Sequence, residues 1–92
     1  MSTTPYPIAK FRCGKIVTTP NVLERLTRED ILCGIGRHHA GDWGDGDNEA
    51  NERALIAKTR LWSVYHATNG TKFWIITEAN RLATTVLLPA DY

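Results

Sequence analysis

The clearest pattern in this chain is the alternation of apolar and polar residues in its C-terminal third. Residues 60–67 and 72–78 are rich in β-branched and aromatic side chains, and Asn69-Gly70 lies between them. Asn-Gly between two apolar runs favours a two-residue type I′ hairpin turn, because both central residues then need positive φ angles. The pattern therefore predicts an antiparallel hairpin, continued through a turn at 79–82 into a third strand over 83–88.

The two-residue turn sets the register of this sheet and assigns side chains to its two faces. It places His66 opposite Phe73, and the four-residue turn places Ile75 opposite Val86. One face then carries the side chains expected to form the core: Trp62, Val64, Phe73, Ile75, Val86 and Leu88. The opposite face carries a second apolar set: Leu61, Tyr65, Trp74, Ile76 and Leu87.

Upstream of the sheet, the apolar positions change to helical spacing. The spacing predicts a short strand over 13–18, followed by helices over 20–26, 28–39 and 48–58. Thr-Pro at 19–20 is a typical helix start, with the Thr hydroxyl as cap and the Pro in the first turn. A Thr at 27 followed three residues later by Asp resembles a capping box for the second helix.

Together these elements predict an α+β fold in a single domain over 1–92. The N-terminal helices are expected to pack on one face of a three- or four-stranded antiparallel sheet, with the 13–18 strand at one edge. Residues 1–12 contain two prolines and are expected to be irregular or to form an edge segment.

The second apolar face of the predicted sheet is the first indication of function. A sheet with helices on one side usually has a polar opposite face, whereas this one keeps Trp74, Tyr65 and several aliphatic residues. Either another segment covers this face, or it is an exposed patch that binds a partner protein or forms a homodimer.

Composition narrows the class of protein. The 92 residues are 42% hydrophobic and 23% charged with a formal net charge of +1, as in a soluble globular domain. No apolar run is long enough to span a membrane, and the first residues lack a secretory h-region, so we expect a cytoplasmic location. Cys13 and Cys33 are too few for a disulfide framework and are expected to be free thiols.

The charge is unevenly placed along the chain. Five of the ten acidic residues, and only one basic residue, lie between Gly41 and Arg53. A local acidic segment on a mildly basic chain can steer a charged partner, although it is equally typical of a solvated loop that leads into a helix N-terminus. Trp43 stands between glycines inside this segment, and we expect it to be buried and to hold the loop against the domain.

Four blocks of residues occur in a specific order along most of the chain: Gly14–Pro20, Arg37–Asp45, Gly70–Arg81 and Thr84–Pro89. They resemble a widespread family of short bacterial proteins found on plasmids, phages and integrative elements. The family pattern has Asp-Arg-Ser where this chain has Asn80-Arg81-Leu82. No established activity comes with the resemblance, which implies a mobile-element setting in which small proteins often disable host defences by binding them.

The start of the acidic segment and the two histidines just before it form the densest set of potential metal ligands. His38, His39, Asp42 and Asp45 combine imidazole and carboxylate groups, which suit Zn²⁺ or another transition metal. Their spacing matches no zinc motif, so a small metal-dependent hydrolase is an alternative hypothesis. The sequence otherwise predicts no cofactor and no catalytic residues.

A nucleic-acid-binding module is a second alternative. Six basic residues are placed so that they could form a strip beside Trp74 and Tyr65: Lys10, Arg12, Lys15, Arg60, Lys72 and Arg81. Stacking side chains combined with cations are typical of single-strand binding. The net charge near zero argues against a dedicated nucleic-acid binder.

The leading hypothesis is a non-enzymatic protein that binds and modulates a macromolecular partner, such as an inhibitor of a host defence system of the anti-CRISPR or anti-restriction type. It rests on the second apolar face, the acidic segment and the family resemblance. The expected partner-binding residues are Tyr65, Trp74, Ile76, Asp42, Asp45 and Asp47.

Overall fold

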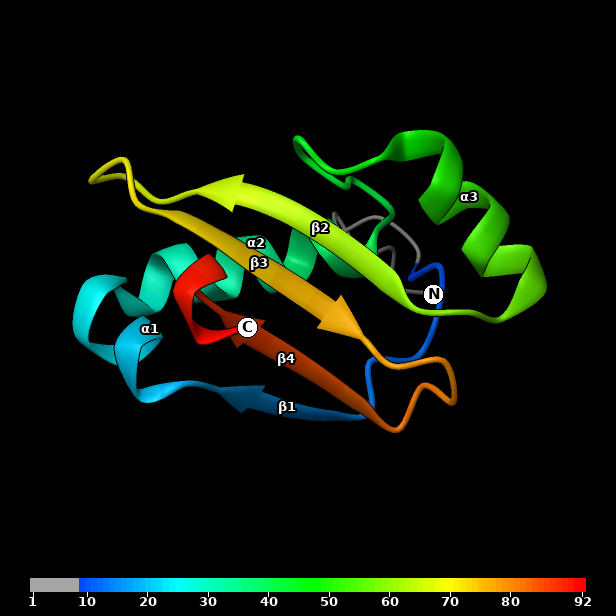
Figure 1. Cartoon of the computed structure of the whole chain (residues 1–92), viewed down its shortest axis with the longest axis horizontal. Helices are drawn as coiled ribbons and strands as arrows, with labels where there is room; N and C mark the ends of the chain where they lie inside the picture. Colours follow the sequence, from blue (N-terminus) through cyan, green and yellow to red (C-terminus); the bar gives the residue numbers. More distant parts are fainter. Residues whose placement is uncertain (1–8) are drawn as a thin grey trace, which may run out of the picture.

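The four strands form one mixed sheet in the order β1-β4-β3-β2 (Figure 1). The computed structural model describes residues 9–92. Its elements in chain order are β1 (Lys15–Thr18), α1 (Pro20–Arg25), α2 (Arg28–His39), α3 (Asn48–Ala57), β2 (Leu61–His66), β3 (Lys72–Thr77), β4 (Ala83–Leu87) and the 3-10 turn η1 (Pro89–Asp91). The predicted α+β fold, with N-terminal helices and a mainly C-terminal sheet, is confirmed.

The edge strand β1 differs from the other strands in direction. It pairs in parallel with β4, whereas β4 with β3 and β3 with β2 are antiparallel. The predicted edge position is therefore confirmed, but the expectation of a wholly antiparallel sheet is wrong. The chain passes through three helices and two strands between β1 and β4, so no hairpin forces these two to run in opposite directions.

The start of the chain is only partly described. Residues 9–12 are irregular, in line with the prediction for the first 12 residues. The rest of that expectation, for residues 1–8, lies outside the described residues.

The three helices begin at side-chain caps. The Thr19 hydroxyl accepts a hydrogen bond from the backbone N–H of Val22, with proline at the first helical position of α1. Thr27 and Asp30 form the predicted capping box of α2. The Asp47 carboxylate caps α3 by accepting from the N–H of Ala50. These local bonds satisfy N–H groups that a helix leaves free at its start.

The β2–β3 hairpin has a different register from the predicted one. Tyr65, rather than His66, lies opposite Phe73, because the loop contains three residues, Thr68 to Gly70. Gly70 has a positive φ of 88°, and Asn69 instead uses its side chain, which donates to the backbone oxygen of Arg25. A turn followed by a left-handed glycine is the common three-residue hairpin loop. The shift of one residue exchanges the two faces of β2.

The main core lies between the sheet and helices α1 and α2. Its buried residues are Val22, Leu26, Tyr65, Ala67, Phe73, Ile75, Val86 and Leu88, with Ile31 and Ile35 packed against them. Gly34 allows α2 to approach β3 closely, since a Cβ at this position would lie 2.9 Å from the Phe73 ring. The predicted pairing of Ile75 with Val86 is confirmed, whereas Trp62 and Val64 are absent from this core.

A second, smaller core anchors the loop before α3. Trp43 is 1% exposed and packs with Ala54 and Leu61, so its predicted burial is confirmed. The loop also pairs with the free edge of β2: the N–H of Val64 donates to the Trp43 oxygen, and the N–H of Asp45 donates to the Val64 oxygen. Gly44 has a positive φ of 63° at this close approach.

The side chain of Asn51 covers the next part of the same strand edge. Its amide accepts from the N–H of Trp62 and donates to the oxygen of Trp62, both at 2.9 Å. The edge of β2 is therefore occupied by the loop and by α3, which protects it from pairing with another chain. None of the helices within residues 9–92 has the length and apolar character needed to cross a membrane.

Candidate functional site

The outer face of the sheet is the face turned away from α1 and α2. The observed register places these side chains at its centre: Trp62, Val64, Trp74, Ile76, Thr85 and Leu87. The same register adds His66 and Lys72 at one end of the face, and Lys15, Val17 and Ala83 toward the β1 edge. Trp62, Val64 and Trp74 are half-buried, whereas Ile76 and Leu87 are buried. The predicted outer-face positions of Trp74, Ile76 and Leu87 are confirmed.

Two residues expected on the outer face lie instead on the inner one. Leu61 and Tyr65 are buried beneath the helices because of the one-residue register shift. The Tyr65 hydroxyl donates to the backbone oxygen of Asp42, and burial raises the pKa of Tyr65 to about 12. Being 2% exposed, Tyr65 is not part of the outer surface on which the sequence placed it.

Three rings form an aromatic cluster on the outer face: Trp62, Trp74 and Tyr92. The two indoles meet edge to face with centroids 4.8 Å apart, and Tyr92 lies 5.1 Å from Trp62 and 5.7 Å from Trp74. Arg60 donates to the Tyr92 hydroxyl at 2.9 Å and pairs with Glu78 at 3.3 Å. The hydrogen bond to Tyr92 and the Glu78 carboxylate raise the pKa of Arg60.

The C-terminal turn η1 lies over part of this face, in front of the sheet in Figure 1. Asp91 holds the turn by accepting from the Thr19 hydroxyl, from Asn21 and from the N–H of Leu88, and these bonds lower its pKa. The cover expected for the second face is therefore partial and comes from the C-terminal turn. The aromatic cluster remains half-exposed beside it.

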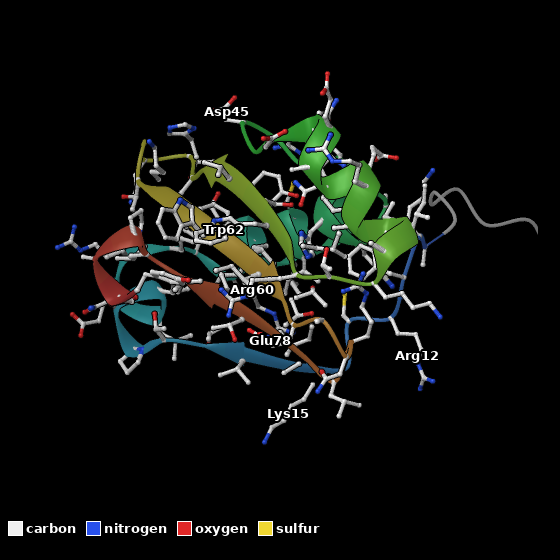
Figure 2. The ribbon with its side chains drawn as sticks, turned by 45° about the vertical axis from the view of Figure 1, so that its right-hand side comes forward. Arg12, Lys15, Asp45, Arg60, Trp62 and Glu78 are labelled. Atoms are coloured by element: carbon white, nitrogen blue, oxygen red, sulfur yellow. The ribbon has the colours of Figure 1, made fainter. Side chains whose placement is uncertain are left out.

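A hollow of about 480 Å³ opens next to the aromatic cluster, between β2 and α3. Trp62 and Val64 contribute apolar surface, and Asp45, Asp47 and Arg60 contribute charge. Figure 2 shows Asp45 and Arg60 on opposite sides of Trp62. The hollow can accept an apolar group against the indole and a cation near the two carboxylates.

The carboxylates around this loop have different roles. Asp42 accepts two hydrogen bonds from the Arg37 guanidinium, at 2.8 and 3.2 Å, and one from the N–H of Gly44. The Arg37 bonds hold the pKa of Asp42 below its usual value. Asp47 caps α3, and Glu52 accepts from the Trp43 indole N–H at 2.9 Å. These three acids therefore stabilise the loop.

Asp45 is the exception among the acids expected to bind a partner. It is exposed, and its carboxylate lies 3.4 Å from the Nδ1 of His66, which is also exposed. Asp42, Asp45 and Asp47 are all exposed, but Asp45 makes no cap or bidentate pair. It is the acid best placed to contact another molecule.

The residues expected to form a metal site are not brought together. His38 points into the core, and within residues 9–92 no three His, Cys, Asp or Glu side chains are arranged to hold a metal ion. Asp42 is bound to Arg37, and Asp45 faces His66 instead of His38 or His39. The geometry therefore does not support the metal-dependent hydrolase.

His38 belongs to a buried polar chain with a defined direction. The Thr84 hydroxyl donates to the Cys13 backbone oxygen, and the Thr77 hydroxyl, 2.7 Å from Thr84, must then donate to it. Thr77 in turn accepts from the Nε2 of His38 at 2.8 Å, so Nδ1 accepts from the Ser63 hydroxyl at 2.6 Å. Every side-chain group in this chain has a partner, which specifies one tautomer and one packing.

Burial also sets the charge of this histidine. Desolvation, together with the nearby His39 and Arg81, lowers the pKa of His38 to about 3, so the ring is neutral at pH 7. Ser63 and His38 are both fully buried, so a substrate does not reach them in this structure. The Ser–His contact is therefore part of the core.

The basic residues separate into two groups. Lys10, Arg12, Lys15, Arg60 and Arg81 come together at one end of the sheet, where β1, β2 and β4 begin and β3 ends. Lys72 lies at the other end, where β3 begins. The single strip expected beside Trp74 and Tyr65 is therefore not formed, since these two rings also lie on opposite faces.

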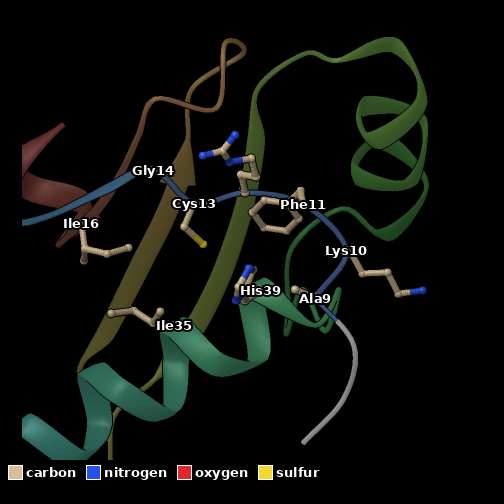
Figure 3. A pocket seen from close by; sticks show the side chains of 9 residues that line it. Ala9, Lys10, Phe11, Cys13, Gly14, Ile16, Ile35 and His39 are labelled. Carbon is tan, nitrogen blue, oxygen red and sulfur yellow. The ribbon is translucent and has the colours of Figure 1, made fainter.

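A further hollow of about 760 Å³ lies between α2, β1 and residues 9–14 (Figure 3). Phe11, Ile16 and Ile35 contribute apolar surface to it, and the half-buried Cys13 lies between them. Burial raises the pKa of the Cys13 thiol, which favours the unreactive protonated form. Cys13 and Cys33 are both free.

Sequence reasoning missed Trp62 and Val64 as outer-face residues, because it chose the two-residue turn. The available signal was Thr68: a three-residue loop that ends in glycine fits Thr68-Asn69-Gly70 as well as the two-residue turn fits Asn69-Gly70. It also missed Lys58, which lies beside Arg12 and Arg81.

Comparisons of the chain with family models, curated proteins and solved structures find no match to it. The binding site proposed below therefore rests on the geometry and chemistry of the chain itself.

Proposed function

We propose that this chain is a non-enzymatic binding protein that recognises a partner protein through the outer face of its sheet. The observation that carries this proposal is the half-exposed aromatic cluster beside a hollow with carboxylates at its rim. Trp and Tyr are enriched among the residues that contribute most to binding at protein interfaces. Half-exposed indoles on a sheet face that α1 and α2 do not cover are consistent with such a role.

The chemistry of the hollow suggests which segment of a partner it takes. Trp62 and Val64 offer apolar surface, and Asp45 offers an exposed carboxylate with no strong internal partner. A partner segment that combines an apolar side chain with Lys or Arg matches both features. This assignment replaces the predicted set around Tyr65 by Trp62, Val64, Trp74 and Asp45.

We propose further that the partner is a component of a host defence system. The support is the resemblance of the four sequence blocks to proteins of plasmids, phages and integrative elements. Inhibitors in that setting commonly act by occupying a surface of the target, which requires a binding face and no catalytic machinery. The same face could also join two copies of this chain.

The test is site-specific photocrosslinking in host lysate. A photoreactive phenylalanine analogue at Trp74 should crosslink to a discrete host protein, whereas the analogue at Leu32, exposed on α2, should not. Crosslinks from Leu32 alone would contradict the proposed face. A crosslink at Trp74 to a second copy of this chain would assign the face to a homodimer.

Affinity for the crosslinked protein then tests the hollow. Val64→Arg places a cation and extra volume in it, and should weaken binding at least about tenfold, as for a residue at the centre of an interface. Leu32→Arg is the matched control, because it adds the same group to an exposed apolar site on α2. Equal affinities of the two variants would remove the hollow from the interface, provided that both unfold at the wild-type temperature.

A further inference from the structure

Six basic residues from three distant parts of the sequence lie at one end of the sheet. They are Lys10, Arg12, Lys15, Lys58, Arg60 and Arg81. Figure 2 shows Arg12 and Lys15 extending outward at this end, with Arg60 and Glu78 nearby. This basic end holds more than half of the eleven Lys and Arg residues of a chain whose net charge is only +1.

The folded chain brings these groups together through Arg81. Its backbone has a positive φ of 62°, and its guanidinium donates to the backbone oxygens of Ala54 and Thr59. These bonds fix the end of α3 beside the β3–β4 turn. Lys58 follows directly as the left-handed residue that ends α3.

Most of the basic end is not neutralised by acids. Arg60 pairs with Glu78. Among residues 9–92, no carboxylate lies within 4.0 Å of the charged groups of Lys10, Arg12, Lys15 or Lys58. All four side chains are exposed. Cations held close together without counter-charges create a positive potential that attracts anions.

A hollow of about 460 Å³ lies among four of these cations. Lys10, Arg12, Lys58 and Arg81 line it together with Asn80, and no acidic residue does. Phe11, Leu55 and Ala79 complete the lining with apolar surface. A phosphate group here would meet several N–H donors and no repelling carboxylate.

Helix dipoles explain only part of this arrangement. Cations are favoured at helix C-termini, and Lys58 and Arg81 lie at the end of α3. Arg12 and Lys15 belong to no helix, and neither makes an ion pair within the described chain. Their charged groups are therefore exposed and available to an anion outside the protein.

We propose that the basic end binds the sugar–phosphate backbone of single-stranded nucleic acid. The cations come from separate segments around one end of a small domain, so phosphates must follow a curved path to reach them. A flexible single strand can follow this path, whereas a duplex is stiff over about 150 base pairs. Arg60 also lines the hollow on the outer face, whereas Lys10, Arg12 and Lys58 do not, so variants at Lys10 and Arg12 test this site independently of the proposed protein partner.

The first experiment measures the fluorescence anisotropy of a labelled 20-nucleotide single strand of mixed DNA sequence. With about four phosphate contacts, binding should weaken about 50-fold between 50 and 200 mM salt. A duplex of the same sequence should bind several-fold more weakly. Binding that does not depend on salt, or equal binding of the duplex, would overturn the proposal.

Charge reversals locate the site. The double variant Lys10→Glu/Arg12→Glu should lose at least about tenfold in affinity at 50 mM salt and show a shallower salt dependence. The control Arg25→Glu/Arg28→Glu changes the net charge equally at the opposite end of α2, on exposed residues. Equal losses of affinity in both double variants would mean that the change in net charge causes the loss, and the proposed site would be rejected.

Two further variants separate this proposal from the protein interface. Val64→Arg adds a cation on the outer face and should leave single-strand binding within about threefold of wild type. Arg12→Lys keeps the charge, so its affinity for the single strand should stay close to that of the wild type, whereas Arg12→Glu should bind more weakly. If Arg12→Lys lost as much affinity as Arg12→Glu, a charge-based phosphate contact at this position would be excluded.

Discussion

The acidic loop and the basic end show opposite relations between sequence and surface. The five acids of the loop are contiguous in the chain, and the structure gives most of their carboxylates internal partners: Arg37 for Asp42, the start of α3 for Asp47 and the Trp43 indole for Glu52. The basic residues are scattered along the sequence, yet they gather in space. Four of them remain exposed without an ion pair in the described chain.

The difference shows that clustering in sequence and availability at the surface are separate properties. Acids next to glycines can bend back onto nearby N–H groups, because a loop offers many unsatisfied donors. Of the cations that arrive from distant segments, Arg81 donates to backbone oxygens and Arg60 pairs with Glu78, whereas the other four make no ion pair in the described chain. In this protein the acidic loop, which is clustered in the sequence, is mainly stabilised by its own carboxylates. The basic end, which is clustered only in space, keeps four exposed cations without an ion pair in the described chain.

Truncation of the loop's anchor should have the largest effect. Trp43→Ala removes a buried ring and leaves the indole's hydrogen-bond partner Glu52 unpaired. We expect the free energy of unfolding to fall by about 3–5 kcal/mol, as for other large aromatic truncations in cores. Urea unfolding followed by circular dichroism measures the change.

A matched variant separates packing from hydrogen bonding at this position. Trp43→Phe keeps most of the volume and loses the indole N–H, so it should lose only about 1–2 kcal/mol. A loss below about 1 kcal/mol for Trp43→Ala would mean that the acidic loop is not anchored through this ring, and the contrast with the basic end would fail.

The next largest effect is a loss of stability in acid that arises from His38, beneath the same loop. The pKa of this ring falls from 6.5 to about 3 on burial, so between these values the unfolded state binds a proton that the folded state does not. Stability is therefore full above about pH 6.5 and decreases as the pH falls. The expected loss between pH 7 and 4.5 is about 2.5 kcal/mol.

The effect can be assigned to one residue. Nuclear magnetic resonance of the imidazole protons should show that the His38 ring stays neutral down to at least pH 4.5. A His38 pKa above 5 in the folded protein would contradict the buried neutral network. Asp42, whose pKa is lowered, adds to the loss only below about pH 4.

The sequence carried enough information for the elements but not for the faces of the sheet. Every helix and strand predicted from periodicity and caps is present within two residues of its expected bounds. The faces of β2 depend on whether its loop has two residues or three, and Thr68-Asn69-Gly70 allows both. In the structure the three-residue loop comes with a tertiary contact, because the Asn69 side chain donates to the backbone oxygen of Arg25 at the end of α1. The local sequence pattern does not predict that contact.

The candidate site depended even more on contacts between distant residues. Burial of Trp43 was predictable, because a tryptophan between glycines in a polar loop has few other physical roles. The separation of His38 from Asp42 and Asp45 was not predictable, because it depends on hydrogen bonds between His38 and residues of two strands. These residues are Ser63 on β2 and Thr77 on β3. The basic end likewise needs Arg81 to hold α3 beside residues 10–12, which no spacing in the sequence indicates.

Two acids of the loop should differ in their effect on stability. Asp47→Ala removes the N-cap of α3 and should lower the free energy of unfolding by about 1 kcal/mol. Asp45→Ala removes an exposed carboxylate whose partner is a histidine in solvent, and should change it by less than about 0.5 kcal/mol. Asp47→Ser, which restores a capping oxygen, should recover most of the loss. Equal losses for the two alanine variants would contradict their assignment to different roles.

The smallest effect on stability is expected at the basic end. Lys10 and Arg12 make no ion pair within residues 9–92, and their mutual repulsion contributes nothing favourable to folding. Lys10→Glu/Arg12→Glu should therefore change the free energy of unfolding by less than about 0.5 kcal/mol. The change should be slightly stabilising at low salt, because the variant removes the repulsion between these two cations and their basic neighbours, and salt screens that repulsion least there. Urea unfolding at 20 and 200 mM salt measures both the size and the sign. Destabilisation by more than about 1 kcal/mol would mean that these cations support the fold as the loop acids do, and the distinction between the two regions would disappear.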